Sequence, residues 1–443
     1  MKPRKLRFDS VLLPQGWGRD VCVSIDSSGL ITAIGAGEGE RVSGITIPGM
    51  ANVHSHAHQR LMQGLAERAG PGADSFWTWR ETMYGFALKL SPEDLEAVAA
   101  QAYMEMLLAG FTAVGEFQYL HHQPDGTPYD NRAEMSLRCV AAAEATGIGM
   151  TMLPVLYSHG GFGGQPPNAG QRRFINDVDG FLDIKSKLSG GIAPHSLRAV
   201  SKDGLQAVLA ATPANQPVHI HVAEQLKEVE DCVAWSGARP VDYMLDNFSV
   251  AQNWCAIHAT HMTDTETLRL AKSNAIAGLC PTTEANLGDG VFPAVSFFKH
   301  GGNFAIGSDS HITLSPAEDL RMLEYSQRLT QHTRNALADG PGHSTGRSLF
   351  DRACQGGAQA LQQNMGSIAI GKRADFVVLE PEHHSLLGRS ENNAVDAWIF
   401  SGGNDCVRDV YVGGVHVVKD RTHFEAAQIT HRFKKTLERL NND

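Results

Sequence analysis

Alternating hydrophobic and polar residues mark both ends of the chain. Residues 21–25 alternate strictly, as in a strand with one buried face, and the Asp-Ser-Ser-Gly turn at 26–29 predicts a hairpin. Near the C-terminus, the apolar run 376–379 is typical of a buried strand, and 410–418 has the pattern of a second hairpin. Both ends of the chain are therefore expected to be rich in β-structure.

Between residues 48 and 365 the pattern is different. Short apolar runs that end in polar residues alternate with segments of helical periodicity. One helix is predicted directly, with Ser91 as its N-cap, Pro92 in its first turn and Asp94 completing a capping box. Strand–helix units repeated over about 300 residues are typical of a (β/α)8 barrel.

These patterns predict an α/β fold of two domains. Residues 48–365 form a TIM-like (β/α)8 barrel, and residues 1–47 with 366–443 form a small β-sandwich domain from both termini, with a C-terminal helix. A chain of 443 residues suits one large and one smaller domain. No linker, repeat or low-complexity tract interrupts it.

Charge and composition restrict the classes of partner. The net charge of −10 argues against nucleic acids and anionic membrane surfaces, and no apolar run is long enough to span a bilayer. The seven cysteines are odd in number and include no CxxC, so a disulfide framework is not expected. We therefore expect a cytoplasmic protein that acts on a small molecule.

The first candidate ligands follow the apolar run that begins the barrel. His54 and His56 are two residues apart, so on a strand both imidazoles point to the same face and can bind one metal ion. His58 continues the alternation and is an alternative ligand, although the chain is expected to have left the strand by that point.

A second predicted strand ends in His221, and Glu224 follows three residues later. His221 offers a third nitrogen, and the Glu224 carboxyl group is suited to moving a proton to a leaving nitrogen. His219 shares the strand face with His221 and is the rival ligand, expected deeper in the barrel. The alternative for Glu224 is an ordinary glutamate at the start of a helix.

His258 and Asp309 end two further predicted strands. Alone, His258 would be interpreted as a hydrogen-bonded core histidine, whereas an acid at the position of Asp309 needs a metal or a catalytic water as partner. Three imidazoles and a carboxylate around an open position suit one Zn²⁺ per chain, which lowers the pKa of a bound water toward about 7. Fe²⁺ or Mn²⁺ accept similar ligands.

The joint pattern resembles the amidohydrolase superfamily. The resemblance covers nearly the whole chain and lies in 48–56, 221–224, His258, 308–309 and 366–376. Binuclear members of the superfamily have a bridging lysine at the fourth strand, and none is found near 191–195. Its absence, together with the HxAE motif at 221–224, is typical of the mononuclear deaminases.

Within that branch the chain resembles the formimidoylglutamate deiminases of histidine degradation. The segments that carry this resemblance are 56–60 with 64–67, 76–81, 115–119, 194–198 and 282–290. The family often has an aromatic residue at the position of His58. The resemblance implies zinc-dependent hydrolysis of N-formimino-L-glutamate to N-formyl-L-glutamate and ammonia, by a homodimer.

The resemblance also implies roles for individual residues. Zinc ligands would be His54, His56, His221 and Asp309; proton-handling groups Glu224, His258 and Asp309; substrate-binding groups Gln59, Arg80, Tyr119, His195 and Arg198. Independently, a substrate with two carboxylates needs arginine forks. The alternative for either arginine is a structural ion pair, or for Arg80 a stack on neighbouring aromatic rings.

Three other functions compete with this interpretation. A deaminase of another amidine or of a ring such as guanine or adenosine would need the metal but not two arginines. A non-catalytic assembly protein usually loses metal ligands, and a binuclear hydrolase needs the missing lysine.

Overall fold

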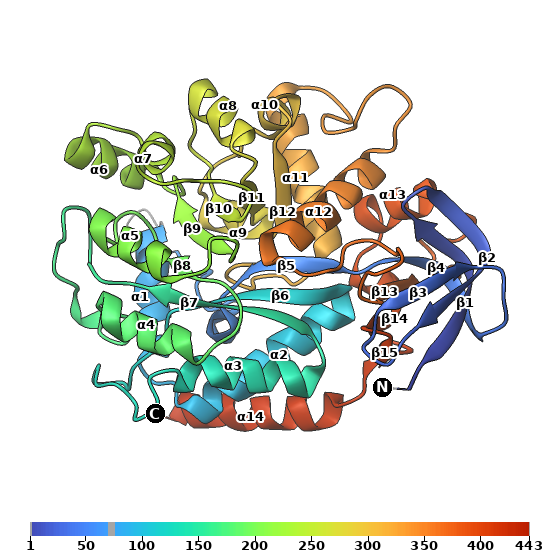
Figure 1. Ribbon diagram of the computed structural model, residues 1–443, viewed down its shortest axis with the longest axis horizontal. Coiled ribbons are helices and arrows are strands. Elements are labelled where there is room, and N and C mark those ends of the chain that lie inside the picture. The colour runs from blue at the N-terminus through green and yellow to red at the C-terminus, as the bar shows by residue number, and fades with distance from the viewer. Residues whose placement is uncertain (1, 70–75, 443) are drawn as a thin grey trace.

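The computed structural model describes residues 2–69 and 76–442. Its centre is a barrel of eight parallel strands (Figure 1), which confirms the predicted (β/α)8 fold. The strands are β5 (Met50–Ser55), β6 (Phe111–Gln118), β7 (Gly149–Leu156), β8 (Ala193–Pro194), β9 (Val218–Val222), β10 (Trp254–His258), β11 (Ile276–Leu279) and β12 (Asn303–Ile306). Parallel bridges from Ile192 to Val218 and from Ser196 to His221 bring β8 beside β9 and close the barrel.

Helices surround these strands. They are α1 (Phe76–Ala87), α2 (Pro92–Ala109), α3 (Glu134–Thr146), α4 (Val178–Ser186), α5 (Lys202–Ala211), α6 (Leu226–Ser236), α7 (Pro240–Asn247), α8 (Asp264–Lys272), α9 (Pro281–Leu287), α10 (Ala294–Lys299), α11 (Pro316–Gln331) and α12 (Thr345–Leu361), with the short 3-10 helices η1 (Ala57–Met62) and η2 (Ala169–Gln171). The capping box of Ser91 and Asp94 starts α2 as predicted. Because parallel strands all end at one rim, the polar residues that follow them gather there.

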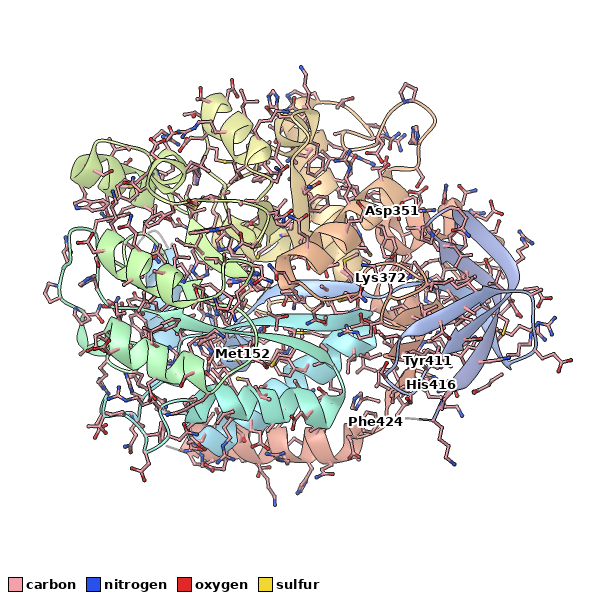
Figure 2. The ribbon with its side chains drawn as sticks, viewed as in Figure 1. Met152, Asp351, Lys372, Tyr411, His416 and Phe424 are labelled. Carbon is pink, nitrogen blue, oxygen red and sulfur yellow. The ribbon has the colours of Figure 1, made fainter. Side chains whose placement is uncertain are left out.

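The two ends of the chain share a second sheet. Its strands are β1 (Arg4–Leu13), β2 (Gly16–Ile25), β3 (Ile31–Gly35), β4 (Glu40–Pro48), β13 (Phe376–Leu379), β14 (Val407–Val412), β15 (Val415–Lys419) and β16 (Thr422–His423), with η3 (Asn404–Cys406) before β14. They form one continuous sheet in the order β16-β15-β14-β13-β4-β1-β2-β3, with its own hydrophobic cluster. Figure 2 shows Tyr411 and His416 side by side on β14 and β15, where their rings stack at 4.2 Å.

The two C-terminal helices pack on different parts of the barrel: α13 (Asn392–Phe400) contacts α11 and α12, and α14 (Ala426–Asn442) contacts α2. The C-terminal helix α14 runs along the outside of the barrel, beneath α2 and α3 (Figure 1). Arg439 pairs with Asp94 and Arg432 with Glu96, so the polar side of α14 is joined to α2 by ion pairs. Helix α14 follows β16, the last strand of the small sheet. The small sheet is therefore connected to the barrel through α14 as well as through the junction of β4 with β5.

All seven cysteines lie in the described part of the chain, where they are buried and unpaired, as expected from their number and spacing. Within the described residues, no helix is long and apolar enough to cross a membrane.

The last barrel helix crosses the strands at very short range. A Cβ atom added at Gly356 of α12 would lie 1.9 Å from the carbonyl oxygen of Phe304 on β12. Only a residue without a side chain lets the two backbones approach this closely. This contact holds β12, and with it the chain leading to Asp309, against α12.

We therefore expect Gly356→Ala to destabilise the protein by about 1–3 kcal/mol through overpacking. The matched control is Gly85→Ala, because Gly85 is an exposed helical glycine whose added Cβ meets nothing within 4 Å. That variant should stay within about 1 kcal/mol of the wild type. Urea unfolding measures both, and equal midpoints for the two variants would contradict the expectation.

Candidate functional site

Four side chains from three strands meet at the carboxyl end of the barrel. His54 and His56 come from the end of β5, His221 from β9, and Asp309 from the loop after β12. His54 Nε2 lies 3.0 Å from His221 Nε2 and 3.3 Å from Asp309 Oδ1, and His56 Nε2 is also 3.3 Å from Asp309 Oδ1. The structure therefore brings together the four residues that the sequence suggested as metal ligands.

The orientation of two of these rings is fixed by backbone carbonyls. His56 Nδ1 lies 2.9 Å from the carbonyl oxygen of Phe117, and His221 Nδ1 lies 2.9 Å from that of His195. Each carbonyl fixes the proton on Nδ1, so the Nε2 lone pairs point toward the centre of the cluster. Burial lowers the pKa of His54 to about 3, so its imidazole is neutral, as metal binding requires.

The strand ends that carry these groups turn sharply. Positive φ angles between 47° and 68° occur at Ala223, His258, Ala259, Asp309 and His311. Such conformations are costly for residues other than glycine and persist only where the surroundings enforce them. These five residues lie at the ends of β9, β10 and β12, where the turns aim side chains into the site.

A network of buried polar groups lies behind the cluster. Ser55 Oγ donates to Glu116 at 2.5 Å and lies 3.1 Å from His311, while the Asn52 amide donates to Ser308 Oγ at 2.6 Å. Burial raises the pKa of Glu116 to about 7. Ser55 and Ser308 are the neighbours of ligands in sequence, so the network fixes the segments that carry them.

His258 lies among three carboxyl groups. Its Nε2 is 3.7 Å from Glu224 and 4.0 Å from Asp309, and its Nδ1 is 3.2 Å from Glu284 on α9. Burial alone would lower the pKa of His258, but the carboxylates raise it to about 10. His258 is thus held as a positively charged imidazolium between Glu224 and Asp309. Sequence reasoning did not identify Glu284, although it lies in one of the segments that carry the resemblance.

Two buried acids also lie close together at this end of the barrel. Burial raises the pKa of Glu224 to about 7, and burial together with the charge of Glu224 raises the pKa of Asp289 to about 9. A carboxyl group with a pKa near neutrality can both accept and donate a proton at physiological pH. Glu224 has the properties expected of a proton shuttle.

A pocket opens above the cluster. Aromatic and aliphatic side chains line it together with all five residues suggested for substrate binding; the lining is His56, Gln59, Trp79, Arg80, Met83, Tyr84, Tyr119, Tyr157, Phe174, His195, Arg198, His221, Glu224, His258, Leu287 and Asp309. The Gln59 amide donates to the Tyr119 hydroxyl at 2.9 Å, and the His195 ring lies 4.4 Å from that of Tyr157. Two cations in one buried pocket suit an anionic ligand.

Each of the two arginines also makes the structural contact that was considered as its alternative role, a stack on an aromatic ring for Arg80 and an ion pair for Arg198. Arg80 lies 5.5 Å from the ring centre of Tyr84, so it stacks and also lines the pocket. Arg198 Nη1 lies 3.8 Å from the buried Glu228 carboxylate. Burial alone would lower the pKa of Arg198, but Glu228 raises it.

The two alternative histidines lie outside the cluster. His58 Nε2 is 2.9 Å from the Tyr119 hydroxyl, on the first turn after β5. His219 Nε2 is 2.9 Å from the carbonyl oxygen of Ala360 at the end of α12, deeper in the barrel.

The geometry of the cluster suits a single metal ion. Donor atoms at the corners of a tetrahedron around Zn²⁺, each about 2.0–2.2 Å from the ion, lie roughly 3.3–3.6 Å apart. The observed separations of 3.0 and 3.3 Å between ligand atoms are close to this spacing. Three neutral nitrogens and one carboxylate oxygen form a donor set that Zn²⁺, Fe²⁺ or Mn²⁺ accepts.

Comparison with known proteins places this geometry in context. Residues 45–417 match the model of the amidohydrolase family. A formimidoylglutamate deiminase of Pseudomonas aeruginosa is 49% identical over 98% of both chains. A 5-methylthioadenosine/S-adenosylhomocysteine deaminase of Shouchella clausii is 28% identical over 85% of this chain and 81% of its own. The crystal structure of an amidohydrolase from Brucella melitensis, 49% identical, superposes with a TM-score of 0.93 over 99% of both chains.

We expect His221→Ala to lose most of its bound metal, because it removes one of four ligands. Two matched controls use the histidines that lie outside the cluster: His219→Gln and His58→Phe should keep the wild-type metal content. Metal analysis after dialysis of purified protein gives the measurement. Equal loss in His219→Gln and His221→Ala would contradict the assignment of the ligands.

Proposed function

The chain belongs to the amidohydrolase family, and we propose that it hydrolyses N-formimino-L-glutamate to N-formyl-L-glutamate and ammonia, a step of histidine degradation. The observation that carries this proposal is the presence of two arginines, Arg80 and Arg198, in the pocket that contains the metal cluster and Glu224. A substrate with two carboxylates accounts for both cations. The name of the relative from Pseudomonas aeruginosa supports the same substrate.

Binding a divalent metal, most simply one Zn²⁺ per chain, would add a Lewis acid that lowers the pKa of a water molecule. His54, His56, His221 and Asp309 would hold it. The other parts of the reaction belong to the protein's own side chains.

Proton transfer is assigned to three neighbouring groups. Asp309, with His258 4.0 Å from it, takes a proton from the attacking water. The water oxygen bonds to the formimino carbon, and Glu224 delivers a proton to the imine nitrogen. Glu224 next takes the hydroxyl proton of the resulting adduct and passes it to the same nitrogen. The carbon–nitrogen bond then breaks and ammonia leaves, while the second nitrogen stays attached to the glutamate as part of a formamide, and the proton held by Asp309 returns to Glu224. His258 lies between Glu224 and Asp309, so it can balance their charges during these transfers.

Substrate binding is assigned to the polar part of the pocket wall. Arg80 and Arg198 bind the carboxylates, since guanidinium groups pair with carboxylates through two hydrogen bonds. Gln59, Tyr119 and His195 orient the chain between the carboxylates and the reacting carbon. The Oε1 atom of Gln59 is buried and has no hydrogen-bond partner among the described residues, so it remains able to accept one from a substrate N–H.

The first test is ammonia release from N-formimino-L-glutamate by purified protein. We expect release that stops with a chelator and returns when Zn²⁺ is added back. Adenosine and guanine serve as comparison substrates and should release little ammonia. A metal-replete protein that releases ammonia from adenosine or guanine but not from N-formimino-L-glutamate would contradict the substrate.

Glu224→Gln tests the proton shuttle. The variant should retain its metal but lose about 10²–10⁴ in kcat, because its amide cannot donate an acid proton. The exposed Glu230, six residues further on, provides the control, and Glu230→Gln should turn over normally. Near-normal turnover by Glu224→Gln would show that another group protonates the nitrogen.

A further inference from the structure

A buried glutamate lies directly behind the pocket and is not part of its lining. Glu228 is on the first turn of α6 and is only 2% exposed. Its Oε1 atom accepts a hydrogen bond from the backbone N–H of Ala223 at 3.1 Å, and its Oε2 atom accepts one from the backbone N–H of Glu224 at 3.0 Å. Both oxygens therefore hold the turn that presents the Glu224 side chain.

That turn needs support from outside. Ala223 has a φ of 53°, a conformation that costs free energy in a residue with a side chain. The two hydrogen bonds from consecutive N–H groups to one carboxylate satisfy the turn and fix its direction. If Glu228 were removed, both N–H groups would lose these acceptors, and the position of Glu224 would be less well defined.

The same carboxylate also faces Arg198. Glu228 Oε2 lies 3.8 Å from Arg198 Nη1, a distance of charge attraction but too long for a hydrogen bond. Arg198 Nη1 is buried and has no hydrogen-bond partner among the described residues. Arg198 is thus held in place by Glu228 while it keeps an N–H group for an incoming carboxylate.

We propose that Glu228 is a positioning residue that sets the spacing between the proton-handling group, Glu224, and the substrate-binding cation, Arg198. The same carboxylate contacts the backbone of Glu224 and the guanidinium of Arg198, so it fixes the distance between these two residues. A substrate therefore fits when the distance from its reacting carbon to its carboxylate matches that spacing. This inference rests on the proposed function. A buried charge with three partners is costly to move, which is what keeps the spacing constant.

The test is Glu228→Gln, which keeps the shape of the side chain but loses the charge and one of the two acceptors. We expect kcat to fall and KM to rise, each by about 10- to 100-fold, because small displacements of reacting groups have effects of this size. The metal content should not change.

Two substrate analogues distinguish the effect of Glu228 on Glu224 from its effect on Arg198. N-formimino-L-norvaline lacks the side-chain carboxylate, and N-formimino-4-aminobutyrate lacks the α-carboxylate. For the analogue without the carboxylate that Arg198 binds, Glu228→Gln should no longer raise KM, because the arginine has nothing to bind. The loss of kcat should persist with both analogues, since Glu224 handles the same nitrogen in each.

Glu324 gives a closely matched control. It is fully buried, accepts the consecutive N–H groups of Ala336 and Leu337 at 2.8 and 3.0 Å, and pairs with Arg328 at 2.7 Å, but none of these residues lines the pocket. Glu324→Gln should lower the unfolding midpoint and leave kcat and KM unchanged. A purely structural Glu228 would behave in the same way, which would overturn the proposal.

If Glu228→Gln does not fold, Glu228→Asp takes its place, because it keeps the charge and draws the carboxylate back by one methylene. For Glu228→Asp we expect the same fall in kcat and rise in KM, and the same loss of the KM effect with the analogue that lacks the carboxylate bound by Arg198. If either soluble variant has the same kcat and KM as the wild-type enzyme, this inference is overturned. The proposed function is still supported in that case, provided that the wild-type enzyme turns over N-formimino-L-glutamate. A wild-type enzyme without activity on N-formimino-L-glutamate would overturn the proposed function and this inference with it.

Discussion

Inside a buried rim, the Nε2 atoms of His54 and His221 face each other at 3.0 Å, a separation that suits two ligands of one bound cation. Protonation is opposed, since burial lowers the pKa of His54 to about 3. The arrangement persists because carbonyl oxygens of Phe117 and His195 fix the rings of His56 and His221, and because three strands deliver the side chains in parallel. The backbone around the cluster thus arranges its donor atoms for one cation, and the turns, the polar network and the closed barrel all contribute to that arrangement.

Charge is divided across the pocket in a way that suits its proposed chemistry. Acidic groups collect around His258, where protons must be taken up and released. Arginines lie in the same pocket, and Glu228 limits the freedom of one of them. Because most of these groups are buried, each charge is stable only beside its partner. The positions of catalytic and binding groups are therefore coupled by electrostatics as well as by the backbone.

Much of the fold and of the metal cluster could be predicted because both follow from local patterns. The two-residue spacing of His54 and His56 predicts that both side chains point to the same side of the strand end, and both do reach the metal cluster. The substrate-binding candidates came from a family resemblance. Glu284 and Glu228 could not be found in this way. Each lies in the first turn of a helix, where an acid is common because it interacts with the helix dipole. Their particular partners, His258 and Arg198, arrive from distant strands. Likewise, the sequence predicts a C-terminal helix but not that this helix packs on α2.

The sharing of one sheet by both ends of the chain also affects how the protein is made. Arg4 on β1 donates to the carbonyl of Gly414, 410 residues away, and β4 pairs with β13. A ribosome releases β4 long before β13 exists, so one edge of the N-terminal strands stays open while the entire barrel is synthesised. Open strand edges are where nascent chains associate wrongly. Closure of this sheet joins segments far apart in the sequence and is hence a late folding event.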